Sequence, residues 1–203
     1  MSKHVRLREL DEDEHEFHEH HDHQCAHNNI DPHYWLDFAN MQSATDVITK
    51  ALIELNPKYK ELYTKNSEAY IHMLEKLDKN YKKHLSSCKA DKVIVNHNAI
   101  GYLSHNYSFH VEALSGLSPE AEPSAKDITR IFEHIKEDAI STIFFESFVN
   151  DRVITTIAKD ANVKLEVLQP LGNITADEAK RNATYEELMY ENLNKLSKAL
   201  MCN

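Results

Sequence analysis

The sequence predicts an α/β protein, with a C-terminal lobe built on a parallel sheet of about four strands and a long helix that joins this lobe to a smaller helical part. From about residue 89, short apolar runs alternate with amphipathic segments. This alternation is typical of βα units whose parallel sheet is covered on both faces. Before residue 89, two long stretches have helical periodicity instead.

Residues 1–30 are polar and lack a periodic apolar pattern. Val5, Leu7 and Leu10 could form a short edge strand or turn, but the acidic, histidine-rich run after them cannot bury enough apolar surface to fold. We therefore expect residues 1–30 to form a disordered loop.

Two helices are predicted next. Asp31-Pro32 is a helix-start signal, and apolar residues then recur at helical spacing to about residue 55. Pro57 opens a longer helix that continues to about Ser86 without an internal glycine or proline. At 1.5 Å per residue this helix would be about 45 Å long, enough to cross a whole domain or to join two.

The remaining segments alternate between strands and helices. Ser124 is a good N-cap for one of the helices. The predicted strands cover residues 92–95, 109–113, 140–145 and 164–168, and the predicted helices cover residues 97–105, 124–137, 150–161 and 184–200, with loops at 116–124 and 170–176. The predicted division of the chain is therefore 1–30, 31–56, 57–88 and 89–203.

Composition excludes some classes of partner. The net charge of −10 disfavours nucleic acid and anionic membranes, which require a basic patch. No apolar run approaches the roughly 20 residues that cross a bilayer, and no apolar segment of a signal peptide follows Met1–Arg6. Taken literally, these features indicate a cytosolic chain.

The three cysteines are too few for a disulfide framework and form no CxxC motif. A Cys88–Cys202 bridge is one option, and unpaired thiols without a role are the other. Cys25 lies among histidines and could be a soft metal ligand.

Metal donors follow the predicted strands. In an open parallel sheet, ligands bind beyond the carboxyl ends of the strands. His97 follows the first strand, Glu146 the third, and Gln169, a weaker oxygen donor, the fourth. His33 is available from the helical part, so a site built between two parts of the chain would combine these side chains. Imidazole suits zinc, and also copper, iron and nickel.

A second group of histidines lies in the acidic run. These histidines can bind cations, but their irregular spacing predicts weak binding, in which different subsets of the histidines hold the ion. They are His15, His18, His20, His21, His23 and His27. The sequence contains no GxSxG, HExxH, P-loop or GxGxxG motif, so no common catalytic signature is present.

Five stretches give the chain a resemblance to the metal-binding solute receptors of bacterial ABC importers, in particular the ZnuA-like zinc branch. They occur in family order and are individually weak but jointly specific; they are Asp31–Leu36, Asn96–Leu103, Leu117–Ser124, Ile143–Glu146 and Leu168–Gly172. The histidine-rich loop before Asp31 is also typical of this branch.

The resemblance implies two α/β lobes joined by one rigid helix, with a metal ion in the cleft between them. It implies that His33 and His97 are ligands and that a histidine at position 97 favours Zn²⁺ over Mn²⁺. Gln169 stands where the family often has an aspartate, so the fourth donor would be Gln169, Glu146, water or a residue of the upstream first lobe. Residues 31–56 would be the helical remnant of that truncated lobe.

The resemblance further implies zinc capture in the periplasm or another extracytoplasmic compartment, without catalysis, and delivery of the ion to a membrane permease. Faces left open by the missing part of the first lobe would favour self-association. Other readings are a cytosolic metal buffer that uses the histidine-rich loop, a receptor for manganese or iron, and a metallohydrolase with Glu146 as base.

Overall fold

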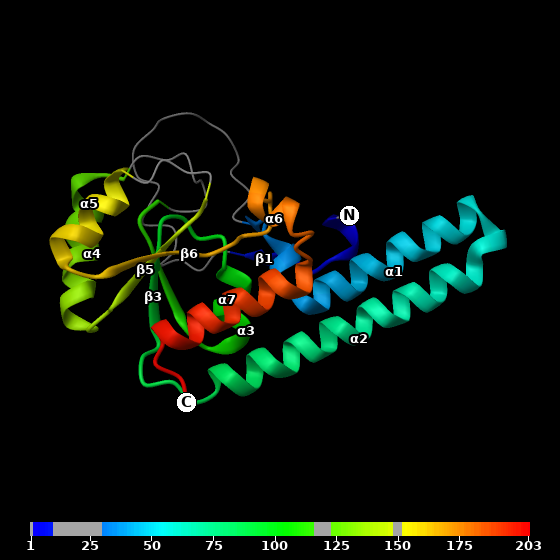
Figure 1. Ribbon diagram of the computed structural model, residues 1–203, viewed down its shortest axis with the longest axis horizontal. Coiled ribbons are helices and arrows are strands. Elements are labelled where there is room, and N and C mark those ends of the chain that lie inside the picture. The colour runs from blue at the N-terminus through cyan, green and yellow to red at the C-terminus, as the bar shows by residue number, and fades with distance from the viewer. Residues whose placement is uncertain (1, 10–29, 116–122, 148–151) are drawn as a thin grey trace.

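The computed structural model describes residues 2–9, 30–115, 123–147 and 152–203. Its elements alternate as predicted from residue 92 onward (Figure 1). In chain order they are η1 (Ser2–His4), β1 (Arg8–Glu9), β2 (Ile30–Asp31), η4 (Tyr34–Leu36), α1 (Phe38–Leu55), η5 (Pro57–Tyr59), α2 (Lys60–Leu85), β3 (Lys92–Val95), α3 (Gly101–Tyr107), β4 (His110–Ala113), α4 (Ala125–Glu137), β5 (Thr142–Phe145), α5 (Arg152–Ala161), β6 (Lys164–Val167), α6 (Ala176–Lys180) and α7 (Tyr185–Ala199).

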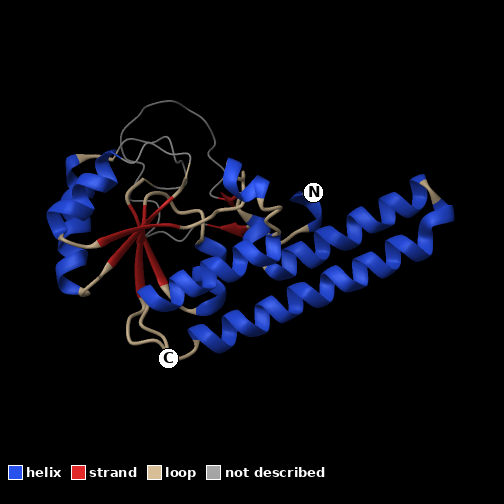
Figure 2. Cartoon of the chain, viewed as in Figure 1, coloured by secondary structure: helices blue, strands red, loops and turns tan. Residues whose placement is uncertain are grey.

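The central sheet has the strand order β4-β3-β5-β6, and all its pairings are parallel. Successive residues of a strand point to opposite faces. Val93 and Val95 accordingly belong to a core with α2, α3 and α7, whereas Ile94 belongs to a core with α4 and α5. Figure 2 shows the strands in red between these two groups of helices. The predicted α/β fold with a four-stranded parallel sheet is thus confirmed.

The two long helices α1 and α2 lie side by side as an antiparallel hairpin that projects from the sheet-containing part (Figure 1). The end of α2 nearest the sheet is anchored in the core by Leu74, Leu77 and Tyr81. The Tyr81 hydroxyl donates a 2.7 Å hydrogen bond to the Met189 carbonyl in α7. The predicted long helix is therefore present. The predicted division of the chain at residues 56 and 88 stays a prediction.

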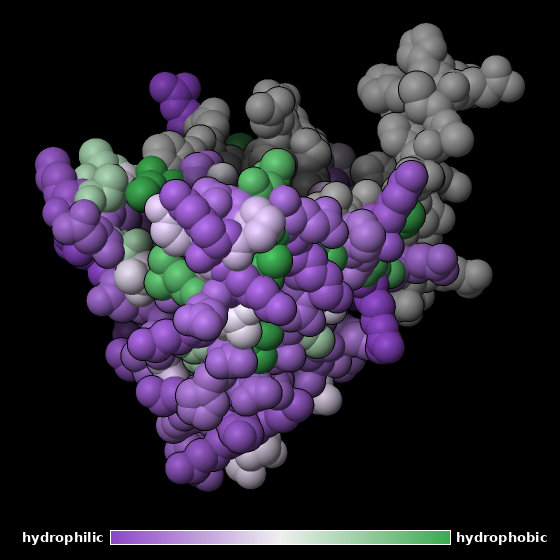
Figure 3. Space-filling model, turned by 90° about the vertical axis from the view of Figure 1, so that its right-hand side faces the viewer, coloured by the Kyte–Doolittle hydropathy of each residue, from purple (hydrophilic) through white to green (hydrophobic). Residues whose placement is uncertain are grey.

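The free end of this hairpin exposes apolar side chains. Figure 3 views this end of the molecule, where apolar residues (green) lie between polar ones (purple). The exposed large apolar residues on α1, η5 and the start of α2 are Ile48, Leu52, Leu55, Tyr59 and Leu62. Within the described residues, no helix is both long and apolar enough to span a membrane.

Helix starts follow side-chain caps. Ser124 caps α4 through a capping box with Asp127, as the sequence predicted. The prediction that Asp31-Pro32 starts the first helix is wrong: α1 begins at Phe38, and Asp37 caps it by accepting a 2.7 Å hydrogen bond from the Asn40 N–H. Asp31 is unavailable as a cap because its carboxylate binds His33.

Two further expectations need correction. Residues 1–30 were predicted to be a disordered loop with a possible short edge strand near Val5–Leu10; β1 (Arg8–Glu9) is such a strand, but its antiparallel partner β2, which places Ile30 opposite Glu9, was not predicted. Residues 10–29 lie outside the described part. The helix α6 was not predicted, although Thr175 and Glu178 form a capping box at its start.

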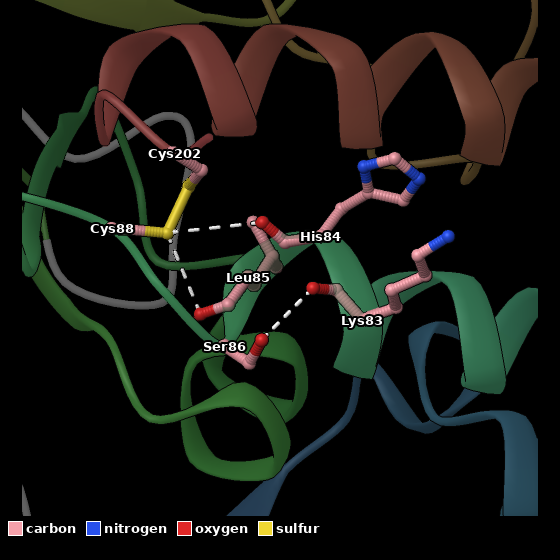
Figure 4. Close-up of a disulfide and its surroundings, with 6 residues drawn as sticks. All are labelled: Lys83, His84, Leu85, Ser86, Cys88 and Cys202. Atoms are coloured by element: carbon pink, nitrogen blue, oxygen red, sulfur yellow. Dashed lines mark hydrogen bonds between the residues drawn. A yellow bond between two sulfur atoms is a disulfide. The ribbon is translucent and has the colours of Figure 1, made fainter.

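Cys88 and Cys202 form a disulfide across 114 residues of sequence (Figure 4). Cys88 lies just after α2, and Cys202 lies just after α7. The two segments also pair as a short antiparallel bridge, in which the Ala90 N–H donates a 3.0 Å hydrogen bond to the Leu200 carbonyl. The disulfide option left open by the sequence is therefore the one that the structure adopts, and it joins the long helix to the C-terminus.

Candidate metal site

The topology of the sheet creates a binding position between β3 and β5. The connection from β3 to β4 runs through α3 on one face, whereas that from β5 to β6 runs through α5 on the other face. The chain therefore leaves these neighbouring strands toward opposite faces, which opens a crevice at their carboxyl ends. His97 follows β3 by two residues and Glu146 follows β5 directly.

His33 reaches this position from the short segment between β2 and η4. It is 8% exposed, and its ring centroid lies 5.5 Å from that of His97, which is 3% exposed. A tetrahedral zinc ion binds imidazole nitrogens at about 2.0–2.1 Å, so two ligating nitrogens are roughly 3.3 Å apart. A ring separation of 5.5 Å suits two imidazoles that share one ion.

Each of the two rings has a carboxylate at its Nδ1 atom. Asp31 Oδ1 lies 2.7 Å from His33 Nδ1, and Asp31 is fully buried. Glu146 Oε1 lies against His97 Nδ1, in a contact that is an ion pair only when the imidazole is protonated and that lacks regular hydrogen-bond geometry. A carboxylate at Nδ1 favours the tautomer with its proton on that atom, which leaves the Nε2 lone pair for a metal.

A small cavity beside His97 lies at the same edge of the sheet. Its lining includes Asn96, His97, Glu146 and Pro170, together with apolar side chains of β3 and β5. Its free space is of the order of a single water molecule or ion. The cavity thus offers room for a small ion beside His97 and Glu146.

Hydrogen bonds fix the His33 segment against the C-terminal lobe. The Trp35 indole N–H donates to the Pro170 carbonyl at 2.8 Å, and the Tyr185 hydroxyl donates to the Trp35 carbonyl at 2.8 Å. The Trp35 ring meets the His33 ring edge-on at 5.4 Å. These contacts join residues 135 and 150 positions apart in sequence and hold His33 in place beside His97.

Gln169 occupies a different environment from the one that the sequence predicted. Its side-chain amide donates to both carboxylate oxygens of Glu178, at 3.1 and 2.9 Å, and its Oε1 accepts from the Leu171 N–H at 3.1 Å. Burial alone would raise the pKa of Glu178, but hydrogen bonds from Thr175 and Gln169 outweigh this effect and lower it. Gln169 therefore supports the turn before α6, and we leave it out of the proposed ligand set.

Other predicted donors fall outside the described residues. They are the histidines of the accessory loop, namely His15, His18, His20, His21, His23 and His27, together with Cys25. Residues 117–122 of the third resemblance motif are also outside. Within the described residues, no group of three or more histidine, cysteine, aspartate or glutamate side chains is arranged to hold a metal. The imidazoles of His33 and His97 are therefore the two candidate nitrogen donors that the described part of the chain brings side by side, with the Glu146 carboxylate next to His97.

Sequence reasoning missed two residues that support His33. The Arg8 guanidinium pairs with Asp31 Oδ2 at 3.3 Å. The Tyr102 hydroxyl donates to the Asp31 carbonyl at 3.0 Å, and burial raises the pKa of Tyr102, so this hydroxyl remains a donor. Tyr102 lies in Asn96–Leu103, one of the five stretches that resemble the family, whereas no local sequence pattern indicates a role for Arg8.

Comparison with known proteins places this chain in a family. A family model described as "ZnuA: Zinc-uptake complex component A periplasmic" matches residues 1–199. The chain belongs to the ZnuA family. The resemblance inferred from the five motifs is thus confirmed.

Individual members of the ZnuA family agree over most of the chain. The high-affinity zinc uptake system protein ZnuA of Bacillus subtilis is 35% identical over 200 residues, which are 98% of this chain and 62% of that protein. The Zn(II)-bound ZnuA-like domain of Streptococcus pneumoniae AdcA superposes with a TM-score of 0.72 at 35% identity, covering 86% of this chain and 66% of that one.

A further solved structure matches almost the whole chain. A mutant of the laminin-binding adhesin Lmb from Streptococcus agalactiae has a TM-score of 0.80 at 30% identity and covers 98% of this chain and 69% of that one. The chain therefore spans about two thirds of the length of these three proteins.

Proposed function

We propose that the chain captures Zn²⁺ as the solute-binding component of an ABC-type zinc uptake system and performs no catalysis. The observation that carries this proposal is the pair His33 and His97, buried side by side with a carboxylate at each Nδ1 atom. Two such imidazoles form a preorganised nitrogen pair, because neither ring must rotate or change tautomer when the ion arrives. The relatives include a zinc uptake protein of Bacillus subtilis and a zinc-binding lipoprotein of Streptococcus pneumoniae, which supports the same ion.

The proposed ligands are His33 and His97, each through Nε2. Imidazole is a borderline donor that suits Zn²⁺ better than the hard cations, and the absence of a charged ligand at position 97 disfavours Mn²⁺. In this arrangement Glu146 orients His97 in the way that Asp31 orients His33. The second carboxylate oxygen of Glu146 is a candidate ligand of the ion. Water or a donor outside the described residues would complete the coordination sphere.

The histidine-rich loop is proposed as an accessory cation collector. Its two ends are hydrogen-bonded neighbours in the β1–β2 pair, and Ile30 is only three residues from His33. Glu9 and Ile30, which flank residues 10–29 in the sequence, therefore lie next to each other close to the His33 segment. The acidic side chains of residues 10–29 would raise the local concentration of cations, and the histidines of this loop would release a weakly bound ion near the tight pair.

An extracytoplasmic location is proposed because the structure contains a disulfide between Cys88 and Cys202. Disulfides persist in oxidising compartments and are rare in the cytosol, which argues against a cytosolic metal buffer. Delivery of zinc to a membrane permease follows from the proposed transport role. Self-association stays a prediction; the apolar residues at the free end of the hairpin would be its contact surface, and light scattering at several protein concentrations tests it.

The proposal is tested by zinc titration calorimetry in the presence of a competing chelator. The double variant His33→Ala, His97→Ala should lose the one tight site. A matched control is His72→Ala, His84→Ala, which removes two exposed histidines of α2 and should leave that site intact. Deletion of residues 10–29 should remove only weak sites. If this deletion abolished the tight site and the His33 and His97 changes had no effect, the result would instead support a metal-buffering protein that binds zinc through the histidine-rich loop.

A further inference from the structure

An arginine far from the metal donors in sequence belongs to the support of the proposed site. We propose that Arg8 is a positioning residue: its ion pair with Asp31 fixes the carboxylate that orients His33, and Gly101 is a glycine because this ion pair occupies the space beside its Cα atom. This inference rests on the proposed zinc site. It concerns how the site is held and leaves the cargo as proposed above.

Both oxygens of the Asp31 carboxylate have partners. Oδ1 accepts hydrogen bonds from the His33 backbone N–H at 2.9 Å and meets the His33 ring at 2.7 Å, while Oδ2 accepts from Arg8 Nη2 at 3.3 Å. The Asp31 side chain is fully buried and that of Arg8 is 11% exposed. Because a carboxylate is planar and rigid, the position of Oδ2 on Arg8 determines where Oδ1 points.

Charge gives Arg8 a role that a neutral donor would not fill. A buried carboxylate is unfavourable unless an opposite charge compensates it. Without the guanidinium, the Asp31 side chain would turn toward solvent or other donors, and the His33 ring would lose the acceptor that fixes its orientation. Arg8 thus acts on His33 through Asp31 and makes no contact with the ion in this account.

Gly101 supplies the space for this ion pair. A Cβ atom added to Gly101 would overlap Arg8 Nη2 and would lie only 2.7 Å from Asp31 Oδ2. Gly101 is buried at the first position of α3 and has no positive φ angle, so its backbone does not require glycine. The close approach of Arg8 and Asp31 therefore explains why a glycine stands at a helix start.

Tyr102 ties the same cluster to the segment of the other ligand. Its hydroxyl accepts a 2.8 Å hydrogen bond from the Arg8 N–H and donates to the Asp31 carbonyl. Gly101 and Tyr102 are the first two residues of α3, and His97 lies four residues before this helix. The cluster of Arg8, Asp31, Gly101 and Tyr102 consequently connects the His33 segment with the His97 segment.

The test compares four variants of the full chain with wild type: Arg8→Met, Arg8→Lys, Gly101→Ala and the double variant Arg8→Met, Gly101→Ala. Zinc affinity is measured by chelator competition, and the tautomer of His33 in the metal-free protein is read from imidazole ¹⁵N chemical shifts. The control Arg181→Met removes an arginine of similar chemistry that pairs with Glu191 at the surface.

Arg8→Met is expected to weaken zinc binding by about 10-fold or more, the usual effect of removing a supporting residue, and to mix the His33 tautomers. Gly101→Ala should have the same effects. The double variant should bind zinc no more weakly than the single variant with the lower affinity, because both changes break the same Arg8–Asp31 contact. Arg8→Lys should restore part of the affinity. If Arg8→Met misfolds, Gly101→Ala and Arg8→Lys provide the same comparison.

Wild-type affinity and one His33 tautomer in both Arg8→Met and Gly101→Ala would overturn the positioning role. Additive losses in the double variant would also contradict it. These outcomes differ from a failure of the proposed function, which would appear as unchanged zinc binding in the His33→Ala, His97→Ala protein.

Discussion

Asp31 binds His33 at two points, since one carboxylate oxygen, Oδ1, contacts both the backbone N–H at 2.9 Å and the ring Nδ1 at 2.7 Å. The backbone contact fixes the main chain at His33, and the ring contact fixes the orientation of the His33 imidazole. Glu146 contacts the corresponding nitrogen of His97. In the proposed zinc site, these two carboxylates from distant parts of the chain would orient the two imidazoles toward one ion.

Asp31→Asn should weaken zinc binding by about 10- to 100-fold, because a neutral amide is a poorer acceptor for the imidazole and leaves Arg8 without its counter-charge. Chelator competition measures this loss. Asp177→Asn is a suitable control, since Asp177 is highly exposed on α6. Equal affinities of the Asp31 and Asp177 variants would contradict the orienting role of Asp31.

Glu146→Gln should also weaken zinc binding, through the orientation of His97. If Glu146 acts only by orienting His97, combining this change with His97→Ala should cause little additional loss, because both changes affect one donor. A large additional loss in the double variant would show that Glu146 itself binds the ion. The same titrations on the two single variants and the double variant complete this cycle.

Removal of the disulfide should destabilise the protein without altering the ligands. Cys88→Ser, Cys202→Ser opens a link across 114 residues, and the loss of such a link in small domains costs about 2–5 kcal/mol. Denaturant unfolding of the metal-free protein measures the change. Wild type in the presence of reductant should behave like the variant, and equal stability of oxidised and reduced protein would argue against a structural role.

Gln169→Ala should reduce stability by about 1–3 kcal/mol, because it removes the hydrogen bonds of a buried amide. Zinc affinity should remain close to that of wild type, since this amide supports the turn before α6. A loss of zinc binding comparable to that of His97→Ala would restore Gln169 to the ligand set.

The contribution of Glu178 to stability should depend on pH. Its pKa in the folded protein lies below the ordinary value of 4.5, so its stabilising effect is fully present above that pH and is lost as the pH falls through the folded pKa. Urea unfolding of wild type and Glu178→Gln between pH 7 and pH 3 should show a difference that shrinks below pH 4.5. A difference in the free energy of unfolding that stayed constant from pH 7 to pH 3 would contradict a stabilising role of the ionised Glu178 carboxylate.

Much of the C-terminal lobe was predictable because its signals are local. The strands predicted at residues 92–95 and 164–168 correspond to β3 (Lys92–Val95) and β6 (Lys164–Val167), and the cap Ser124 starts its helix as predicted. The candidate donors His97 and Glu146 were predicted from their places after strands, and the parallel topology brings both to one edge of the sheet. The sequence did not show that both would contact each other, because this depends on the order β3-β5 in the sheet.

The errors arise where a side chain has a distant partner. Asp31 was expected to start a helix, but it binds His33 and Arg8, so Asp37 takes the capping role. The hydrogen bonds between Gln169 and Glu178 were not foreseen, because Glu178 lies in a short helix that had not been predicted. Arg8 had no local signal because its function depends on a contact with a residue 23 positions away.

The most direct test of the zinc site is a crystal structure of the 1:1 zinc complex with anomalous diffraction measured on both sides of the zinc absorption edge. The anomalous peak should lie about 2.0–2.1 Å from Nε2 of His33 and from Nε2 of His97. A peak bound only by histidines of residues 10–29, with the rings of His33 and His97 free of metal, would contradict this account.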